Sequence, residues 1–209
     1  MKDFARRADD VLRGRPSPRS WPVLVICGLV YGGVMGAFGG RPGQMAISAV
    51  KVPLLLLATL ALSLPSYFVI NTLFGLRSDF VEALRGIVAS QAGLTVVLIA
   101  LAPLTAFWYA TSRDYQAAVL FNAAMFAVAS LAAQLLLGRA YRVLIARDPL
   151  HRQLLRIWVV IYAFVGIQMG WILRPFIGAP GAPVRFFRSG DWESAYVVVA
   201  RMIWEALRR

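Results

Sequence analysis

Long apolar stretches alternate along the chain with short segments that hold nearly all of the charged residues. Five stretches contain no Asp, Glu, Lys or Arg, and they cover residues 20–40, 52–76, 86–112, 115–138 and 157–173. A helix needs roughly 20 mostly apolar residues to cross a bilayer, with a tolerated range of about 17–25. The pattern therefore predicts an all-α membrane protein, a bundle of five transmembrane helices with a further amphipathic helix at the C-terminus.

The composition agrees with this pattern. Of the 209 residues, 59% are hydrophobic and 15% are charged, and the mean hydropathy is +0.67. A soluble domain carries about 25% charged residues, so a chain of this composition is expected in a membrane.

The segments between and beyond the spans complete the predicted domain organisation. Residues 1–19 form a basic cytoplasmic arm, residues 20–178 the five-span domain, and residues 179–209 a Pro/Gly loop followed by the amphipathic helix. That last helix is expected either to lie in the bilayer interface or to dock on the bundle. Short loops are expected at 41–51 and 77–85, a tight turn at 111–115, and the longest internal loop at 139–156, with a break at Asp148-Pro149.

The basic residues predict how the chain is oriented. With the N-terminus in the cytoplasm, the inner segments hold 13 Lys and Arg residues and the outer segments hold 9, in the sense of the positive-inside rule. We expect an inner-membrane (plasma-membrane) protein with its N-terminus inside and its C-terminus outside. The net charge of +12 then indicates contact with anionic lipids and not with nucleic acid.

Small residues recur at helical spacing in the first apolar stretch. Gly28, Gly32, Gly36 and Gly40 follow one another every four residues, and Gly166 and Gly170 form a second pair in the last stretch. Glycines at this spacing form a flat groove that lets another helix approach closely. The groove is expected to pack against another span of the same chain, against a second subunit, or to line a pore.

Two further sets of residues are candidates for a role. Asn71, Gln91, Asn122, Gln134 and Gln168 lie within the apolar stretches, where they either line a polar pathway or form hydrogen bonds between helices. Trp171, Arg174, Trp192 and Trp204 have the character of interface anchors. For Arg174, an ion pair with Asp191 or Glu193 is the alternative to anchoring at the interface.

The residues that the apolar stretches lack argue against catalysis. None of the five contains Asp or Glu, and Lys51 and Arg139 are expected only to flank them. Ion-coupled carriers need an ionisable group at membrane depth. His151 is the only histidine, placed in the basic 139–156 loop, and Cys27 is the only cysteine. We therefore expect no enzyme, no metal site and no cofactor.

Several motifs together carry a resemblance. Lys51-Val-Pro-Leu-Leu-Leu-Leu, Leu64-Pro-Ser-Tyr-Phe-Val, Leu101-Ala-Pro-Leu and Gly170-Trp-Ile-Leu-Arg-Pro-Phe-Ile-Gly resemble a family of uncharacterised bacterial five-span membrane proteins. The layout of five spans after a cytoplasmic N-terminus is also similar to the Yip1-domain family of membrane-trafficking proteins. The first resemblance implies no activity, and the second implies membrane organisation or recruitment of partners.

Two functional hypotheses follow. The chain forms an oligomeric, channel-like or pore-forming assembly built around its glycine-rich first span, or it is a scaffold or accessory subunit of a larger membrane complex. The first predicts a homo-oligomer with a continuous polar lining, and the second predicts other membrane subunits as partners.

Overall fold

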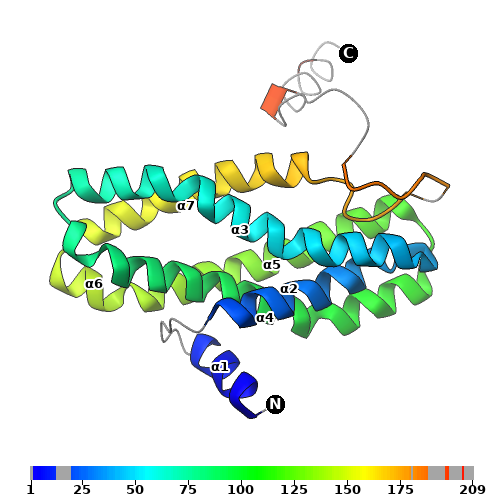
Figure 1. Cartoon of the computed structure of the whole chain (residues 1–209), viewed down its shortest axis with the longest axis horizontal. Helices are drawn as coiled ribbons and strands as arrows, with labels where there is room; N and C mark the ends of the chain where they lie inside the picture. Colours follow the sequence, from blue (N-terminus) through cyan, green and yellow to red (C-terminus); the bar gives the residue numbers. More distant parts are fainter. Residues whose placement is uncertain (1, 13–19, 180, 188–195, 198–203, 205–209) are drawn as a thin grey trace.

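The chain folds into an elongated bundle of helices that run along one axis (Figure 1). The computed structural model describes residues 2–12, 20–179, 181–187, 196–197 and 204. Its helices are α1 (Lys2–Leu12), α2 (Trp21–Gly36), α3 (Pro42–Leu73), α4 (Phe80–Thr111), α5 (Tyr115–Ala140), α6 (Arg142–Arg147) and α7 (Leu150–Ile172). Two short 3-10 turns, η1 (Phe38–Gly40) and η2 (Arg77–Asp79), lie between them. Throughout the described residues the regular structure is helical, as expected for an all-α fold.

Each long helix packs against particular neighbours in the bundle. α2 lies between α3 and α4 and packs against both, α5 packs against α4, and α7 packs against α3. α1 lies against α4 outside the bundle, below it in Figure 1. Val11 of α1 is buried there beside Cys27 and Ala92. α5 and α7 therefore pack mainly on different helices, α5 on α4 and α7 on α3.

Four helices in the described part of the chain are long and apolar enough to cross a bilayer, namely those that contain α3, α4, α5 and α7. α2 has 16 residues, about 24 Å at 1.5 Å per residue, which is less than the ~30 Å of a hydrocarbon core. It is followed by η1, where Gly39 and Gly40 have positive φ. The predicted span 20–40 is thus a short helix and a turn, and a fifth span stays a prediction.

The prediction of a loop at 41–51 is wrong. α3 begins at Pro42 and continues for 32 residues, so Lys51 lies inside a candidate span and does not flank it. Proline suits the first helical position because its fixed φ is helical and its missing N–H is not needed there. Lys51 is tolerated inside the helix because its ammonium group has a buried acceptor, described below.

The other predicted connections are shorter than expected. α4 begins at Phe80, inside the predicted 77–85 loop, and the 139–156 loop contains the end of α5, all of α6 and the start of α7. The predicted break is confirmed, because Asp148 has an extended backbone and its side chain accepts a hydrogen bond from the Leu150 amide at 2.8 Å. The tight turn at 111–115 is also confirmed, and Asp114 caps the start of α5.

The glycines of α2 bring it directly against α3. A Cβ on Gly28 would lie 3.3 Å from the ring of Pro53, and one on Gly32 would overlap the backbone carbonyl of Ser48. A Cβ on Gly36 would lie 2.7 Å from the backbone carbonyl oxygen of Gln44. The groove is therefore occupied by α3 of the same chain. Gly40 is not part of it, because it lies in η1 with a φ of 66° and a Cβ there would meet nothing within 4 Å.

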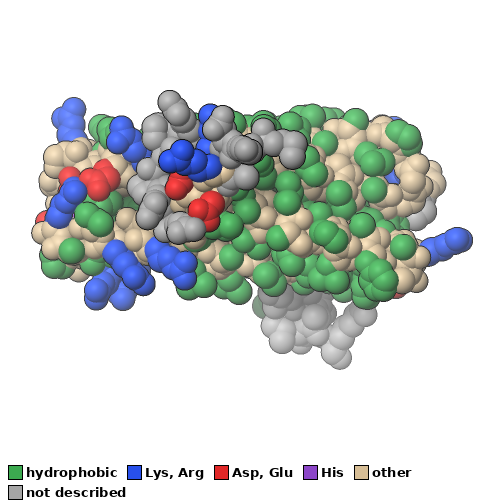
Figure 2. All heavy atoms as spheres, turned by 90° about the horizontal axis from the view of Figure 1, so that it is seen from below, with side chains coloured by type: hydrophobic (Ala, Val, Ile, Leu, Met, Phe, Trp, Pro, Cys, Tyr) green, Lys and Arg blue, Asp and Glu red, His purple; other side chains and the backbone are tan. Residues whose placement is uncertain are grey.

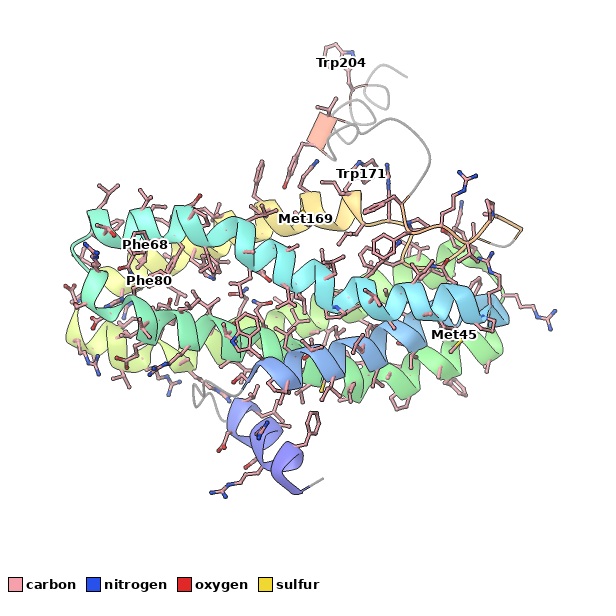
Figure 3. All side chains as sticks on the ribbon, viewed as in Figure 1. Met45, Phe68, Phe80, Met169, Trp171 and Trp204 are labelled. Atoms are coloured by element: carbon pink, nitrogen blue, oxygen red, sulfur yellow. The ribbon has the colours of Figure 1, made fainter. Side chains whose placement is uncertain are left out.

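Charged side chains gather toward one end of the bundle, on the left in Figure 2, and most of the remaining length of that face is hydrophobic. This end holds η2, the start of α4, α6 and the start of α7. Asp79 connects them, with its carboxylate 3.0 Å from Nε2 of the fully buried His151 and 3.7 Å from Arg147. Arg147 also contacts Glu82 at 2.6 Å. Figure 3 shows Phe68 and Phe80 side by side here, with ring centres 5.1 Å apart.

Most of the predicted amphipathic helix at 191–209 lies outside the described residues. Of its described positions, Tyr196 contacts α7: its hydroxyl donates a hydrogen bond to the Phe164 carbonyl at 2.6 Å, and its ring stacks on that of Phe164 at 4.4 Å. The last part of the predicted basic arm, residues 13–19, likewise lies outside them.

Candidate ligand cavity and its wall

A cavity of about 910 Å³ lies between α3, α5 and α7 and the segment that follows α7. α5 and α7 line it and pack on different neighbours, α4 and α3, and the lining residues Val119 of α5 and Ile167 of α7 are exposed. Figure 1 shows the segment after α7 at the end of the bundle opposite α6. Its size is in the usual range of ligand pockets, about 300–1,000 Å³.

The side walls of the cavity are apolar. They are formed by Met35, Leu55, Val119, Ala123, Phe126, Ile167 and Gly170. Ile167 is 58% exposed, and a Cβ on Gly170 would meet nothing within 4 Å. These surfaces favour hydrocarbon groups over water.

One end of the cavity is polar. Gln44 lies in the first turn of α3 and Tyr115 is the first residue of α5, so both lie at the end of the bundle. Arg174 completes this end, and Asn122 lines the cavity further in. The apolar Leu55 and Phe126 come from residues three turns deeper in α3 and α5. The cavity thus changes from polar at the end of the bundle to apolar toward its middle.

The polar end is built on an irregular segment, residues 173–179, which we term the wall segment. It begins at Leu173, where α7 ends, and includes a cis peptide bond between Arg174 and Pro175. Leu173, Ile177 and Gly178 are buried. Backbone carbonyls that are buried without a helix or sheet need other donors, and here side chains of other helices supply them.

A polar stripe on α3 supplies most of these donors. Gln44, Ser48 and Lys51 are buried on one face of the helix at spacings of four and three residues. The Gln44 amide donates to the Phe176 carbonyl at 3.1 Å, and the Ser48 hydroxyl donates to the same oxygen. The Lys51 ammonium donates to the Pro175 carbonyl at 2.7 Å. The stripe therefore holds the wall segment against α3.

Two further side chains fix the far part of the wall. Arg41 donates to the Ala179 carbonyl at 2.9 Å and to the Ala182 carbonyl at 2.7 Å. The Tyr115 hydroxyl donates to the Ile177 carbonyl at 3.3 Å. A side chain at Gly178 would overlap the Arg41 guanidinium. The wall is therefore held from both α3 and α5.

Lys51 has an unusual environment for a charged side chain. It is fully buried, and its ammonium lies 5.8 Å from the ring centre of Phe176 and 5.1 Å from that of Phe186. No carboxylate among the described residues lies within ion-pair distance of it. Buried charges are usually paired with an opposite charge. Among the described residues, the Lys51 ammonium instead contacts the Pro175 carbonyl and the two rings.

The predicted polar residues do not form one row. Gln91 accepts a hydrogen bond from the Tyr162 hydroxyl at 2.9 Å. Asn122 belongs to a separate hydrogen-bonded group. Its side-chain amide accepts a hydrogen bond from the Tyr31 hydroxyl at 3.3 Å and donates one to the Tyr109 hydroxyl at 2.6 Å. Asn71 is buried nearer the charged end, Gln134 is exposed on α5, and Gln168 is half-buried. Of the five, only Asn122 lines the cavity.

The remaining predicted residues also differ in their surroundings. Gly166 lies against α3, where a Cβ would meet Thr59 at 3.5 Å, whereas Gly170 lines the cavity. Trp171 lies at the end of α7 (Figure 3), with the Arg174 guanidinium 3.1 Å from its ring centre. Trp204 is 58% exposed. Trp192, like the proposed ion-pair partners Asp191 and Glu193, lies outside the described residues.

The sequence reasoning missed the wall segment and the stripe that holds it. One signal was present, because Gln44, Ser48 and Lys51 are polar at helical spacing. This spacing was not recognised as one face of a helix, because the lysine was assumed to mark the end of a span.

When the chain is compared with protein-family models, with curated proteins and with solved structures, nothing matches. The resemblances drawn from the motifs and from the layout of the spans therefore stay predictions. The function is inferred from the cavity itself.

Proposed function

We propose that this chain is a membrane protein that binds an amphipathic, lipid-like molecule, which enters the cavity from the bilayer between α5 and α7. The observation that carries this proposal is the change along the cavity from a polar end to apolar walls. A lipid within one leaflet has the same arrangement, with its headgroup at the membrane surface and its chains toward the middle. The role is one of binding, and no catalytic residue is assigned.

The walls of the cavity support a specific site over a loose gap between helices. An irregular backbone segment inside a membrane protein is stable only where its polar groups are satisfied within the protein. The wall segment meets this condition through Lys51, Ser48, Gln44, Arg41 and Tyr115. A fixed polar end beside apolar walls is the arrangement by which pockets orient a ligand.

A channel has less support from the same geometry. The glycine groove is occupied by α3 of the same chain, and the predicted polar residues form separate hydrogen-bonded groups. The scaffold hypothesis is compatible with a lipid-binding cavity, but no contact in the described part of the chain points to a protein partner.

Filling the cavity tests the proposal. Gly170→Trp places a large side chain in the cavity, because an added Cβ there meets nothing within 4 Å. Gly138→Trp is the matched control: it makes the same change on α5, also with nothing within 4 Å, away from the cavity lining. Native mass spectrometry after detergent washing should show retained lipid on the wild type and on Gly138→Trp, and its loss from Gly170→Trp.

Either of two results would contradict the proposal. Equal lipid retention by Gly170→Trp and the wild type, with both proteins folded, would show that bound lipid lies elsewhere. A wild type that retains no lipid from any extract would show that the cavity is not a lipid site.

We further propose that the protein lies in the inner membrane with the α6 end of the bundle in the cytoplasm. The α6 end holds Arg77, Arg85, Arg139, Arg142, Arg147, Arg152 and Arg156, and basic residues favour the cytoplasmic side. In a Cys27→Ser background, Gln116→Cys at the opposite end should react with a membrane-impermeant maleimide in intact cells. Ser78→Cys in η2 should react only after lysis, and the reverse pattern would invert the orientation.

A further inference from the structure

Positive charge surrounds the polar end of the cavity. Arg174 lines it, and the Lys51 ammonium and Arg41 guanidinium bind the wall segment from the α3 side. No Asp or Glu is among the described residues that line the cavity. Arg41 and Lys51 contact carbonyl groups and no carboxylate among the described residues, so these two groups make the polar end electropositive. Charge interactions are stronger there than in water because the surroundings have a low dielectric constant.

Lys51 is the most deeply buried of these three charged residues. A buried ammonium group that lacks a carboxylate is costly, because a carbonyl and aromatic rings replace only part of its hydration. Its burial beside the wall segment is explained if the positive charge attracts a ligand in the cavity. Pro175 and Phe176, which contact the ammonium, also line the cavity, so the positive charge lies next to the cavity wall.

We infer that the ligand of this cavity is anionic, a membrane lipid whose phosphate headgroup carries net negative charge and lies beside Arg174 and Tyr115. This inference rests on the proposed function and specifies the headgroup. The guanidinium has five N–H donors in a fixed fork, so it can bind a phosphate oxygen while its face stays on Trp171. The Tyr115 hydroxyl makes only a long hydrogen bond to the wall, at 3.3 Å, and can turn toward the headgroup.

The direction of the cavity fits a lipid better than a free anion. A soluble phosphate would use the polar end alone and leave the apolar walls at Leu55, Phe126 and Ile167 unused. A lipid places its chains along those walls and its headgroup at the end of the bundle. The tail thus gives affinity through apolar burial, and the headgroup gives selectivity through charge.

The experiment compares two lipids with identical chains, a phosphatidylglycerol and a phosphatidylcholine, offered to delipidated full-length protein. Binding is followed by native mass spectrometry, and only the lipid adduct that Gly170→Trp abolishes is counted. The wild type should prefer the anionic lipid by about tenfold, equivalent to 1.4 kcal/mol. Arg174→Gln and Lys51→Met should each reduce that preference, and Arg174→Lys should keep most of it.

Control and competitor variants separate the possible outcomes. Arg113→Gln removes a positive charge from an exposed residue at the same end of the bundle, outside the cavity lining, and should leave the preference unchanged. Inorganic phosphate at millimolar concentration should not displace the lipid, and displacement would indicate a free-anion site instead.

The two proposals fail in different ways. If the wild type binds both lipids equally and Gly170→Trp abolishes both, the cavity is a lipid site and the anionic headgroup is wrong. The same conclusion follows if folded Arg174→Gln and Lys51→Met retain the wild-type preference; should Lys51→Met not fold, Arg174→Gln decides alone. If no adduct depends on Gly170, the proposed function itself fails.

Discussion

Individual residues decide how closely α2 and α3 approach. Gly32 lies where a Cβ would overlap the Ser48 carbonyl and come within 2.8 Å of the Ala49 Cα. Backbone atoms cannot move aside as a flexible side chain can, so the helices must separate to accommodate even one methyl group.

Gly32→Ala should therefore destabilise the protein by about 2–3 kcal/mol, as expected for overpacking against a rigid surface. Gly33→Ala, one residue along, is the matched control, because its Cβ meets only the Ala49 side chain at 4.0 Å. Thermal unfolding in detergent compares the two. If they unfold at the same temperature, α2 does not pack on α3 through Gly32. A folded Gly32→Ala protein of smaller mass than the wild type would instead indicate a subunit interface.

At the scale of elements, contacts between charged and polar side chains connect the start of α4 to α6 and α7 at the charged end of the bundle. The carboxylate of Asp79, in η2, lies 3.0 Å from Nε2 of His151 and 3.7 Å from the Arg147 guanidinium. His151 is fully buried, so removing its partner leaves a polar group without compensation. Glu82 contacts only Arg147, and both of these side chains are substantially exposed.

Asp79→Ala should accordingly cost about 1–3 kcal/mol, the penalty of a buried polar group without a partner. Glu82→Ala should cost less than about 1 kcal/mol, because exposed ion pairs contribute little. Limited proteolysis between α5 and α7, together with thermal unfolding, measures both effects. Equal loss of stability in the two variants would show that the His151 contact adds nothing.

The elements also show how far sequence reasoning reaches. The positions of α4, α5 and α7 follow from uncharged stretches of spanning length, and Asp148-Pro149 and the 111–115 turn are local signals that the structure confirms. The start of α3 was misplaced, because the cost of Lys51 is offset by the Pro175 carbonyl, 124 residues away in sequence. A local pattern carries no information about such a distant partner.

The cavity could not be predicted for the same reason. Its apolar lining looks like any lipid-facing surface in the sequence, and its polar end exists only because the wall segment folds back between α3 and α5. Pro175 and Gly178 are residues that interrupt a helix. Their positions in the sequence carry no information about which side chains bind the carbonyls of this segment.

The whole molecule is a bundle whose long helices are suited to a bilayer and which has a polar-ended cavity lined by α3, α5, α7 and the wall segment. The central claim is that a lipid occupies this cavity.

The most direct measurement is an experimental density map of the protein in a lipid nanodisc, with a bound antibody fragment to add mass. We expect elongated density between α5 and α7, with the lipid headgroup beside Arg174 and Tyr115 and the chains along Phe126 and Ile167. A map in which Val119 and Ile167 are in contact, or in which residues of this chain fill the space, would contradict it.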